Sequence, residues 1–195
     1  MKELIRIFST TQYKGTRNYL DSQKKYEIIR TLIYFGISAS LFIAGYIATK
    51  TKMNYLTIVA VLGCLPASKS LIGVIMFLRH KSCSQKVCER LDSISYELTE
   101  LYDLVFTSYD KDFEIAHMVI AGNTICGYTE SSKYDDKAFQ PHIANVLKLD
   151  GHKNATVKIF TDLNKYIDRI VQLNTSEADT SNSASIAETL KSVTL

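Results

Sequence analysis

The 195-residue sequence predicts a membrane protein in which a two-helix transmembrane hairpin precedes a cytoplasmic α/β domain. Three observations support this fold class. Two long apolar runs lie at residues 32–49 and 55–78, and a link of about six residues joins them. Beyond them, residues 84–173 alternate between strand and helix patterns. The total hydrophobic fraction is an ordinary 46%, so the apolar residues are concentrated in the two runs.

The two apolar runs suit the thickness of a bilayer. Residues 32–48 contain no charge, and as a helix they would extend over roughly 25 to 29 Å, close to a hydrocarbon core of about 30 Å. A cleaved signal peptide would begin closer to the N-terminus and would not be followed at once by a second run. Lysine and arginine precede the first run and follow the second, whereas the link has only Lys50 and Lys52. The positive-inside rule therefore places both termini in the cytoplasm, and we expect a bacterial inner membrane.

Lys69 is the single charge in the second run, and it follows Pro66, which is expected to kink the helix. A lysine in the middle of a membrane costs at least about 2.5 kcal/mol, so its ammonium group must extend to the interface, find a partner or line a wet cavity. We favour extension to the interface or a structural contact. A transport or channel role is the alternative.

Small residues recur at a spacing of four in the first run, at Gly36, Ser40 and Ala44, and again at Gly63 and Ala67 in the second. This spacing lets helix backbones approach each other closely in lipid. The pattern predicts either packing within the hairpin or a homo-oligomer through Gly36, Ser40 and Ala44.

The parts outside the hairpin differ in composition. Residues 1–31 form a basic cytoplasmic segment with interspersed tyrosines, which is expected either to lie on anionic lipid or to pack on the soluble domain. Residues 174–195 are rich in Ser, Thr and Ala, which predicts a flexible tail. The four cysteines and four histidines have no zinc-binding spacing, so we expect reduced cytosolic thiols and no cofactor.

The domain at residues 84–173 has the predicted element order α-β-β-β-α-β-α. Its first helix could form a short coiled-coil dimer, although packing on a sheet is favoured. Gly122 and Asn123 lie between two β-rich runs, which is typical of a hairpin turn, and Gly151 is expected to end a helix. The expected elements are a helix at 84–101, strands at 102–108, 113–122 and 124–130, a helix at 137–149, a strand at 155–160 and a helix at 163–173.

This order resembles the core of the PD-(D/E)xK nuclease-like fold. Within it, FEIAHMVIAGNTICGYTES (113–131) resembles the two central strands of the nuclease-related (NERD) domain, and VKIFTD (157–162) is similar to its later core strand. The resemblance implies an Asp before the retained His117, followed by a Glu and a Lys on the next strand. In such enzymes the carboxylates hold Mg²⁺, and the lysine helps to activate water.

The residues at the implied catalytic positions cannot perform this chemistry, because they are Ala116, Thr129 and Ser131. A relocated site would draw on Glu114, His117, Glu130 and Lys133. Glu130 and Lys133 are three residues apart, so they lack the two-residue spacing that places side chains on one face of a strand. A charged loop at a sheet edge and a buried structural histidine explain these four residues without catalysis.

No phosphate-binding loop, dinucleotide fingerprint, nucleophile elbow or HExxH motif is present. The sequence therefore predicts a membrane-anchored pseudoenzyme that acts as an interaction or sensing module at the cytoplasmic face. Its partners would be the lipid bilayer and a protein or nucleic acid. The alternatives are a metal-dependent nuclease, which would need Mg²⁺, and a small membrane effector or channel subunit.

Overall fold

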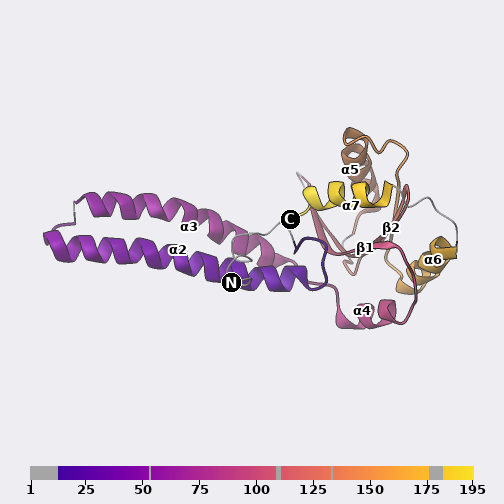
Figure 1. Ribbon diagram of the computed structural model, residues 1–195, viewed down its shortest axis with the longest axis horizontal. Helices are drawn as coiled ribbons and strands as arrows, with labels where there is room; N and C mark the ends of the chain where they lie inside the picture. The colour runs from indigo at the N-terminus through magenta and orange to yellow at the C-terminus, as the bar shows by residue number, and fades with distance from the viewer. Residues whose placement is uncertain (1–12, 53, 109–110, 133, 176–181) are drawn as a thin grey trace. The chain divides into compact units, whose positions relative to one another are not determined.

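The computed structural model describes residues 13–52, 54–108, 111–132, 134–175 and 182–195. The chain divides into two compact units (Figure 1). One is a helical hairpin over Leu20–Lys81, and the other is an α/β domain formed by Ser82–Leu195 together with the described residues 13–19.

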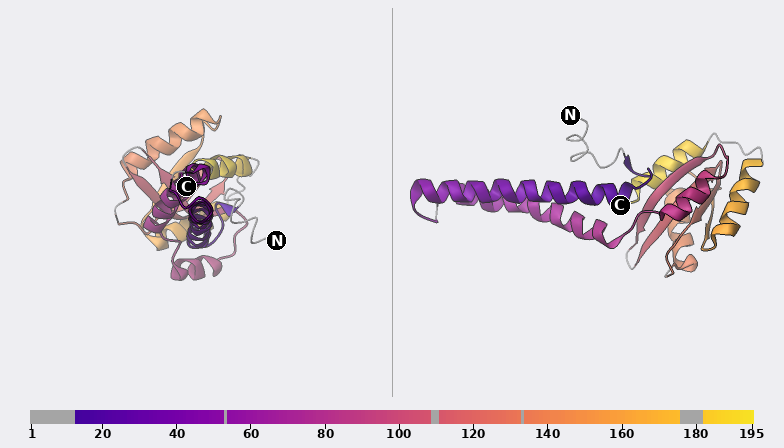
Figure 2. Two further views of the ribbon diagram at one scale, coloured as in Figure 1. Left: turned by 90° about the vertical axis from the view of Figure 1, so that its left-hand side faces the viewer. Right: turned by 90° about the horizontal axis from the view of Figure 1, so that it is seen from below.

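The hairpin consists of α2 (Tyr19–Thr49) and α3 (Tyr55–Arg79), which run antiparallel side by side (Figure 2). The second predicted span agrees with α3 almost residue for residue. The first is the apolar part of a longer helix, because α2 begins 13 residues before the uncharged run at residue 32. Part of the segment predicted at residues 1–31 is therefore continuous with the first span, and residues 1–12 lie outside the described chain.

Small and hydroxyl side chains form the contact between the two helices. The hydroxyl oxygens of Thr31 and Ser70 are 2.7 Å apart. A Cβ atom added to Gly63 would lie 2.6 Å from the hydroxyl oxygen of Ser38. One added to Gly45 would lie 2.8 Å from the Cβ atom of Leu56. The close approach of the helices thus depends on residues that leave room for the backbone.

Large hydrophobic side chains lie on the outside of the hairpin. Leu32 and Leu65 each expose 67% of their surface, and similar residues on both helices are exposed as well. Both helices are long and apolar enough to cross a membrane. The hairpin is thus apolar outside and small or polar inside, opposite to a soluble helical hairpin.

A four-stranded mixed sheet forms the centre of the α/β domain. Its strands follow the chain order β1-β2-β3-β4 across the sheet. The first three strands are antiparallel neighbours, and β4 pairs parallel to β3. The strands are β1 (Thr99–Thr107), β2 (Asp112–Ala121), β3 (Thr124–Tyr128) and β4 (Thr156–Phe160).

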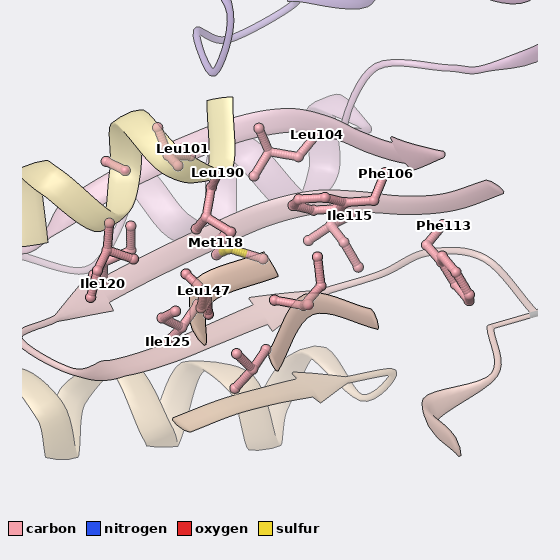
Figure 3. Close-up of a cluster of buried hydrophobic side chains, with 14 of the residues drawn as sticks. Leu101, Leu104, Phe106, Phe113, Ile115, Met118, Ile120, Ile125, Leu147 and Leu190 are labelled. Carbon is pink, nitrogen blue, oxygen red and sulfur yellow. The ribbon is translucent and has the colours of Figure 1, made fainter. Parts of the chain in front are cut away.

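Helices cover both faces of this sheet, giving three layers. The helices are α4 (Gln85–Asp92), α5 (Asp136–Leu149), α6 (Leu163–Thr175) and α7 (Ser183–Ser192). On one face, α5 and α7 pack on a core that includes Phe106, Met118 and Ile125 (Figure 3). On the other face, α4 and α6 pack around Val119 and Tyr166. The predicted order from the first domain helix to α6 is confirmed.

Two predicted turns form as the sequence indicates. Gly122, with φ of 59°, and Asn123 join β2 to β3 in a two-residue turn, because Ala121 pairs with Thr124. Gly151 follows α5 with φ of 91°. The amide of His152 donates to the carbonyl of Leu147 at 2.8 Å, which is the bond of a glycine-terminated helix end.

The helix predicted at residues 84–101 is too long. α4 ends at Asp92, and β1 begins at Thr99, which pairs with Ile120 of β2. Leu101 seemed to continue the helical apolar stripe, but it contributes to the core from a strand. Sheet pairing outweighs a three-turn helical pattern here, because the pairing buries both faces of the segment.

The prediction of a flexible tail at residues 174–195 is wrong for the last part of the chain. α7 buries Ile186 and Leu190 completely against the sheet. Beyond the helix, the amide of Leu195 donates to the carbonyl of Val105 at 3.0 Å. Spacing of four residues between two apolar side chains is enough for one helical contact, even in a Ser- and Thr-rich segment.

Residues 13–18 pack on the α/β domain, which was one of the two expectations for the N-terminal segment. The carbonyl of Gly15 accepts a hydrogen bond of 2.9 Å from the amide of Tyr102. Arg17 forms an ion pair of 2.9 Å with Asp92. Together with the C-terminal residues, this segment covers the outer edge of β1, where exposed backbone groups would invite pairing with another chain.

Candidate functional site

Of the positions implied by the nuclease resemblance, Ala116 lies on β2 and the other two follow the end of β3, where they form a structural contact. The Thr129 hydroxyl donates a 2.6 Å hydrogen bond to the carbonyl oxygen of Glu114, and it accepts one of 3.1 Å from the amide of Ser131. Thr129 is buried, and Ala116 is packed against the core on the α6 face. These side chains hold β3 against β2 and offer no ligand for a metal ion.

The acidic and basic candidates for a relocated site do not come together. Glu130 accepts hydrogen bonds from the amide of Ser84, at 3.1 Å, and from its hydroxyl, at 2.5 Å. Since Ser84 is the N-cap of α4, the carboxylate of Glu130 stabilises the beginning of that helix. Glu114 lies on β2, and Lys133 lies outside the described residues. Within the described chain, no group of three His, Cys, Asp or Glu side chains could hold a metal ion.

His117 is the fourth candidate, and it lies at the centre of a buried polar network. Its Nδ1 atom is 2.8 Å from the hydroxyl oxygen of Tyr166 on α6. Its Nε2 atom is 3.5 Å from the carboxylate of Glu100 on β1. The ring of Tyr102 lies against the imidazole with 4.4 Å between centroids. Glu100 also accepts a hydrogen bond of 2.8 Å from Tyr96.

The protonation state of this network follows from burial. Burial raises the pKa of Tyr166 well above its usual range, so its hydroxyl keeps its proton and donates to Nδ1 of His117. Burial also lowers the pKa of His117, although Glu100 opposes the shift. The imidazole is therefore neutral and carries its proton on Nε2, which points at Glu100. The nearby imidazole of His117 lowers the pKa of Glu100, with the hydroxyl of Tyr96 adding to the effect.

This network connects three elements and is closed to substrates. His117 and Tyr166 have no exposed surface, so no reacting group could reach either nitrogen of the ring. Glu100 is the point where the network meets solvent, since 45% of its side chain is exposed. The arrangement fixes β1, β2 and α6 to one another and keeps the imidazole out of reach of molecules at the surface.

One buried carboxylate, that of Asp103, was not singled out by the sequence. Asp103 lies in β1 with φ of 54°, a conformation that side chains other than glycine rarely adopt. Its Oδ1 atom accepts a hydrogen bond of 2.7 Å from the amide of Cys83. The strand pairing of β1 and β2 is interrupted at Asp103, between the pairs of Tyr102 with His117 and Leu104 with Ile115. The sequence gives one indication of this site, which is a charged residue inside an apolar strand.

The thiols of the domain are buried and unreactive. Cys83, Cys88 and Cys126 lie in the core on the α6 face. Burial raises the pKa of Cys83, with the neighbouring thiol of Cys88 contributing, and burial also raises the pKa of Cys126. The thiols of Cys83 and Cys126 therefore remain protonated at neutral pH, and the thiolate needed for attack is not formed there.

The accessible candidate is a basic groove between β4 and α6, with a volume of about 430 Å³. We define the basic groove by three cations, one aromatic ring and two further polar side chains. Lys158 extends over the ring of Phe160 with its Nζ atom 5.2 Å from the ring centroid. The guanidinium of Arg169 donates to Gln172 at 3.1 Å. The lining residues are Lys158, Phe160, Lys165, Asp168, Arg169 and Gln172.

The groove has the chemistry of an anion-binding surface. Three cations face one carboxylate, Asp168, which leaves an excess of positive charge. The groove also adjoins a sheet edge, because β4 pairs only with β3 in the part of the chain that the structure describes. Sequence reasoning missed this site. Lys165 and Arg169 lie one turn apart on α6, but Lys158 lies on β4, and only the packing of α6 beside β4 brings the three cations together.

Comparison with other proteins adds no assignment. No protein family, curated protein or solved structure matches this chain. The fold is described by its own elements: two long apolar helices followed by an α/β domain with a mixed four-stranded sheet. The PD-(D/E)xK-like fold and the nuclease-related family remain a resemblance of element order and of one short segment.

Proposed function

We propose that this protein is a membrane-anchored interaction module. The hairpin of α2 and α3 crosses the membrane twice, and the α/β domain binds an acidic partner at the cytoplasmic face. The inverted packing of the hairpin carries the proposal. Large apolar side chains such as Leu32 and Leu65 are exposed, while Thr31 and Ser70 meet inside. Exposed apolar side chains along two whole helices are stable in lipid and unfavourable in water.

The orientation of the anchor follows from the distribution of positive charge. Basic residues precede the uncharged part of α2 and follow α3, so both ends are cytoplasmic. Residues 80–84 join α3 to α4. Five residues span at most about 18 Å, so the α/β domain stays tethered within a short distance of the end of α3. Tethering of this kind raises the effective concentration of the domain for partners at the same surface.

The basic groove is the contact surface that we propose for the module. Lys158, Lys165 and Arg169 would pair with the carboxylates of an extended acidic segment of a protein. The adjacent edge of β4 could accept such a segment as an added strand. Among the described residues of the domain, the thiols are buried, whereas the basic groove is open to a partner.

Cysteine accessibility tests the anchor. In a Cys64→Ser background, Thr51→Cys would place a thiol in the link and Ser95→Cys would place one in the α/β domain. We expect a membrane-impermeant maleimide to label position 51 in intact cells, and position 95 only after lysis. The chain should also stay with the membrane in alkaline carbonate. Labelling of both positions from the same side, or recovery of the chain as a soluble protein, would contradict the proposal.

Binding of defined anionic probes tests the module. The full chain in nanodiscs of zwitterionic lipid is titrated with a fluorescent polyglutamate peptide and with a single-stranded oligonucleotide. We expect the peptide to bind, Arg169→Glu to weaken that binding about tenfold or more, and Lys153→Glu to leave it nearly unchanged. Lys153 is an exposed cation outside the groove. Equal effects of both reversals, or preferential binding of the oligonucleotide, would contradict an acidic protein partner.

No observation on the described residues favours either alternative from the sequence. The candidate residues for a nuclease site do not lie close together, and the carboxylate of Glu130 accepts a hydrogen bond from the amide of Ser84. For a channel, Lys69 was the sole indication, and it lies beside a polar cluster near one end of the apolar part of α2. Neither a nuclease nor a channel is proposed.

A further inference from the structure

The register of the hairpin places Lys69 at one end of the uncharged part of α2. Thr31 meets Ser70, and Ser38 meets Gly63, so positions that face each other have numbers that add to 101. Lys69 is therefore level with residue 32, where the uncharged run of α2 begins. If the uncharged run of α2 marks the span, as in the proposed anchor, Lys69 lies near the cytoplasmic end of that span and not in its middle.

A pocket of about 570 Å³ opens beside Lys69 between the two helices. Its polar lining comes from Arg30 and Tyr34 on α2 and from Lys69 and Ser70 on α3. Two cations and two hydroxyl groups thus surround one space. Phosphate oxygens are bound in proteins by guanidinium, ammonium and hydroxyl donors of this kind.

Arg30 is held toward this pocket by a buried carboxylate. Glu27, which is 3% exposed, forms an ion pair with the Arg30 guanidinium. The Nε atom of Arg30 also lies 3.4 Å from the hydroxyl oxygen of Ser70. Glu27 compensates one of the two positive charges. The second, on Lys69, has no hydrogen bond or ion pair to any residue in the described part of the hairpin.

The remaining walls of the pocket are apolar. Pro66 and Met76 lie on α3 on either side of Lys69 along the helix, and Ile72 adds to this lining. An ion without a hydrocarbon chain would leave these walls in contact with water. A phospholipid satisfies both parts, because its phosphate reaches the cations and its acyl chain covers the apolar surface.

We infer that this pocket binds the phosphate headgroup of an anionic phospholipid from the cytoplasmic leaflet. The inference rests on the proposed membrane anchor. Lys69 and Arg30 bind the phosphate, Tyr34 supplies a hydroxyl donor, and the acyl chain runs along α3 past Pro66. Binding of the headgroup gives Lys69 the counter-charge that the hairpin lacks, so the lipid fixes the depth of α3 in the membrane.

The test measures which lipid stays bound to the full chain. The chain is inserted in membranes that contain equal amounts of phosphatidylglycerol and phosphatidylcholine, and native mass spectrometry then counts the lipids that remain on the released protein. We expect phosphatidylglycerol to be retained preferentially, and Lys69→Met to reduce this preference roughly fivefold. Methionine keeps the length of the side chain and enters lipid more easily, so loss of insertion is not expected. Lys25→Met is the matched control, because it removes the same charge from an exposed position outside the pocket.

Three outcomes would overturn the inference. Equal preference in wild type, Lys69→Met and Lys25→Met would show that the pocket does not select the headgroup. An equal loss in both variants would show that general charge attracts the lipid. Displacement of the lipid by millimolar inorganic phosphate would assign the site to a free anion. Carbonate extraction of the same membranes tests the membrane anchor separately from the lipid site. If the chain stays in the membrane but shows no lipid preference, the lipid site is refuted and the anchor is not.

Discussion

The Nδ1 atom of His117 lies 2.8 Å from the hydroxyl oxygen of Tyr166, and this contact ties the central strand β2 to α6. Both side chains are fully buried. The ring of Tyr166 also stacks on Tyr128 of β3, with 5.8 Å between centroids. One tyrosine therefore supplies packing with its ring and a donor with its hydroxyl, and it replaces water as the partner of a buried imidazole.

Removing the hydroxyl of Tyr166 should destabilise the α/β domain. In Tyr166→Phe the ring packing is kept, but Nδ1 of His117 loses its donor and remains buried, which costs about 1 to 3 kcal/mol of unfolding free energy. Hydrogen exchange of β2 amides in the full chain in nanodiscs measures this loss. Tyr128→Phe is the control, because the Tyr128 hydroxyl has no hydrogen-bond partner among the described residues. Similar losses in both variants would contradict the assigned role of this bond.

Acid should weaken the same domain. The folded pKa of His117 is lowered from 6.5, so below about pH 6.5 the unfolded chain binds a proton that the folded ring does not. Stability is therefore fully present above pH 6.5 and is lost as the pH falls toward the folded pKa. The pKa of Glu100 is also lowered, from 4.5, so its contribution is lost at still lower pH with the same sign.

A variant without a titrating ring isolates the first of these effects. His117→Phe should lower the stability at neutral pH, because the Tyr166 hydroxyl loses its acceptor. Between pH 7 and pH 5, however, its stability should vary less with pH than that of the wild type. The measurement is hydrogen exchange of the sheet amides at several pH values, corrected for the intrinsic exchange rate. A pH dependence equal to that of the wild type would assign the effect to other groups.

The sequence predicted those parts of the fold in which a local pattern agrees with the tertiary environment. α3 was predicted closely, because an apolar run of its length is typical of a membrane-spanning helix. The turn at Gly122 and the helix end at Gly151 were predicted because both need a positive φ. The beginning of β1 was missed, because Thr99 and Leu101 suit a helix until they pair with β2.

The candidate site depends on contacts between distant residues, and this is why it was less accessible from the sequence. His117 and Tyr166 are 49 residues apart, and no spacing rule links them. Lys158 and Arg169 share a groove only because β4 lies beside α6. Lys69 was noticed as an isolated charge, but its level in the hairpin required the contact of Thr31 with Ser70.

The last helix should be essential to the core. Leu190 on α7 is fully buried in the cluster that includes Phe106 and Met118. Leu190→Ala should cost about 2 to 5 kcal/mol through lost transfer energy and the cavity that remains. Glu188→Ala, on the exposed side of the same helix, should change stability by less than about 0.5 kcal/mol. Denaturant titration followed by limited proteolysis of the full chain compares them, and equal resistance of the two variants would argue that α7 does not belong to the core.

The close approach of the two hairpin helices near their connecting link should depend on Gly45. A Cβ atom at this position would lie 2.7 Å from the Oδ1 atom of Asn54 and 2.8 Å from the Cβ atom of Leu56. Asn54 cannot easily move, since the same Oδ1 atom accepts a hydrogen bond from the amide of Thr57 at the beginning of α3. Gly45→Ala should therefore separate the helix ends and cost about 1 to 3 kcal/mol.

Gly36→Ala is the matched control for this substitution, because no atom lies within 4 Å of the added methyl group. Gly36, Ser40 and Ala44 are exposed on α2, so they do not pack within the hairpin. In detergent, the thermal stability of the hairpin should fall in Gly45→Ala and stay close to the wild-type value in Gly36→Ala. If Gly36 instead mediates contact between copies of the chain, Gly36→Ala should change the mass of the detergent-solubilised particle measured by light scattering, while Gly45→Ala should not. Loss of stability in both variants without a change in mass would contradict the hairpin register on which the position of Lys69 depends.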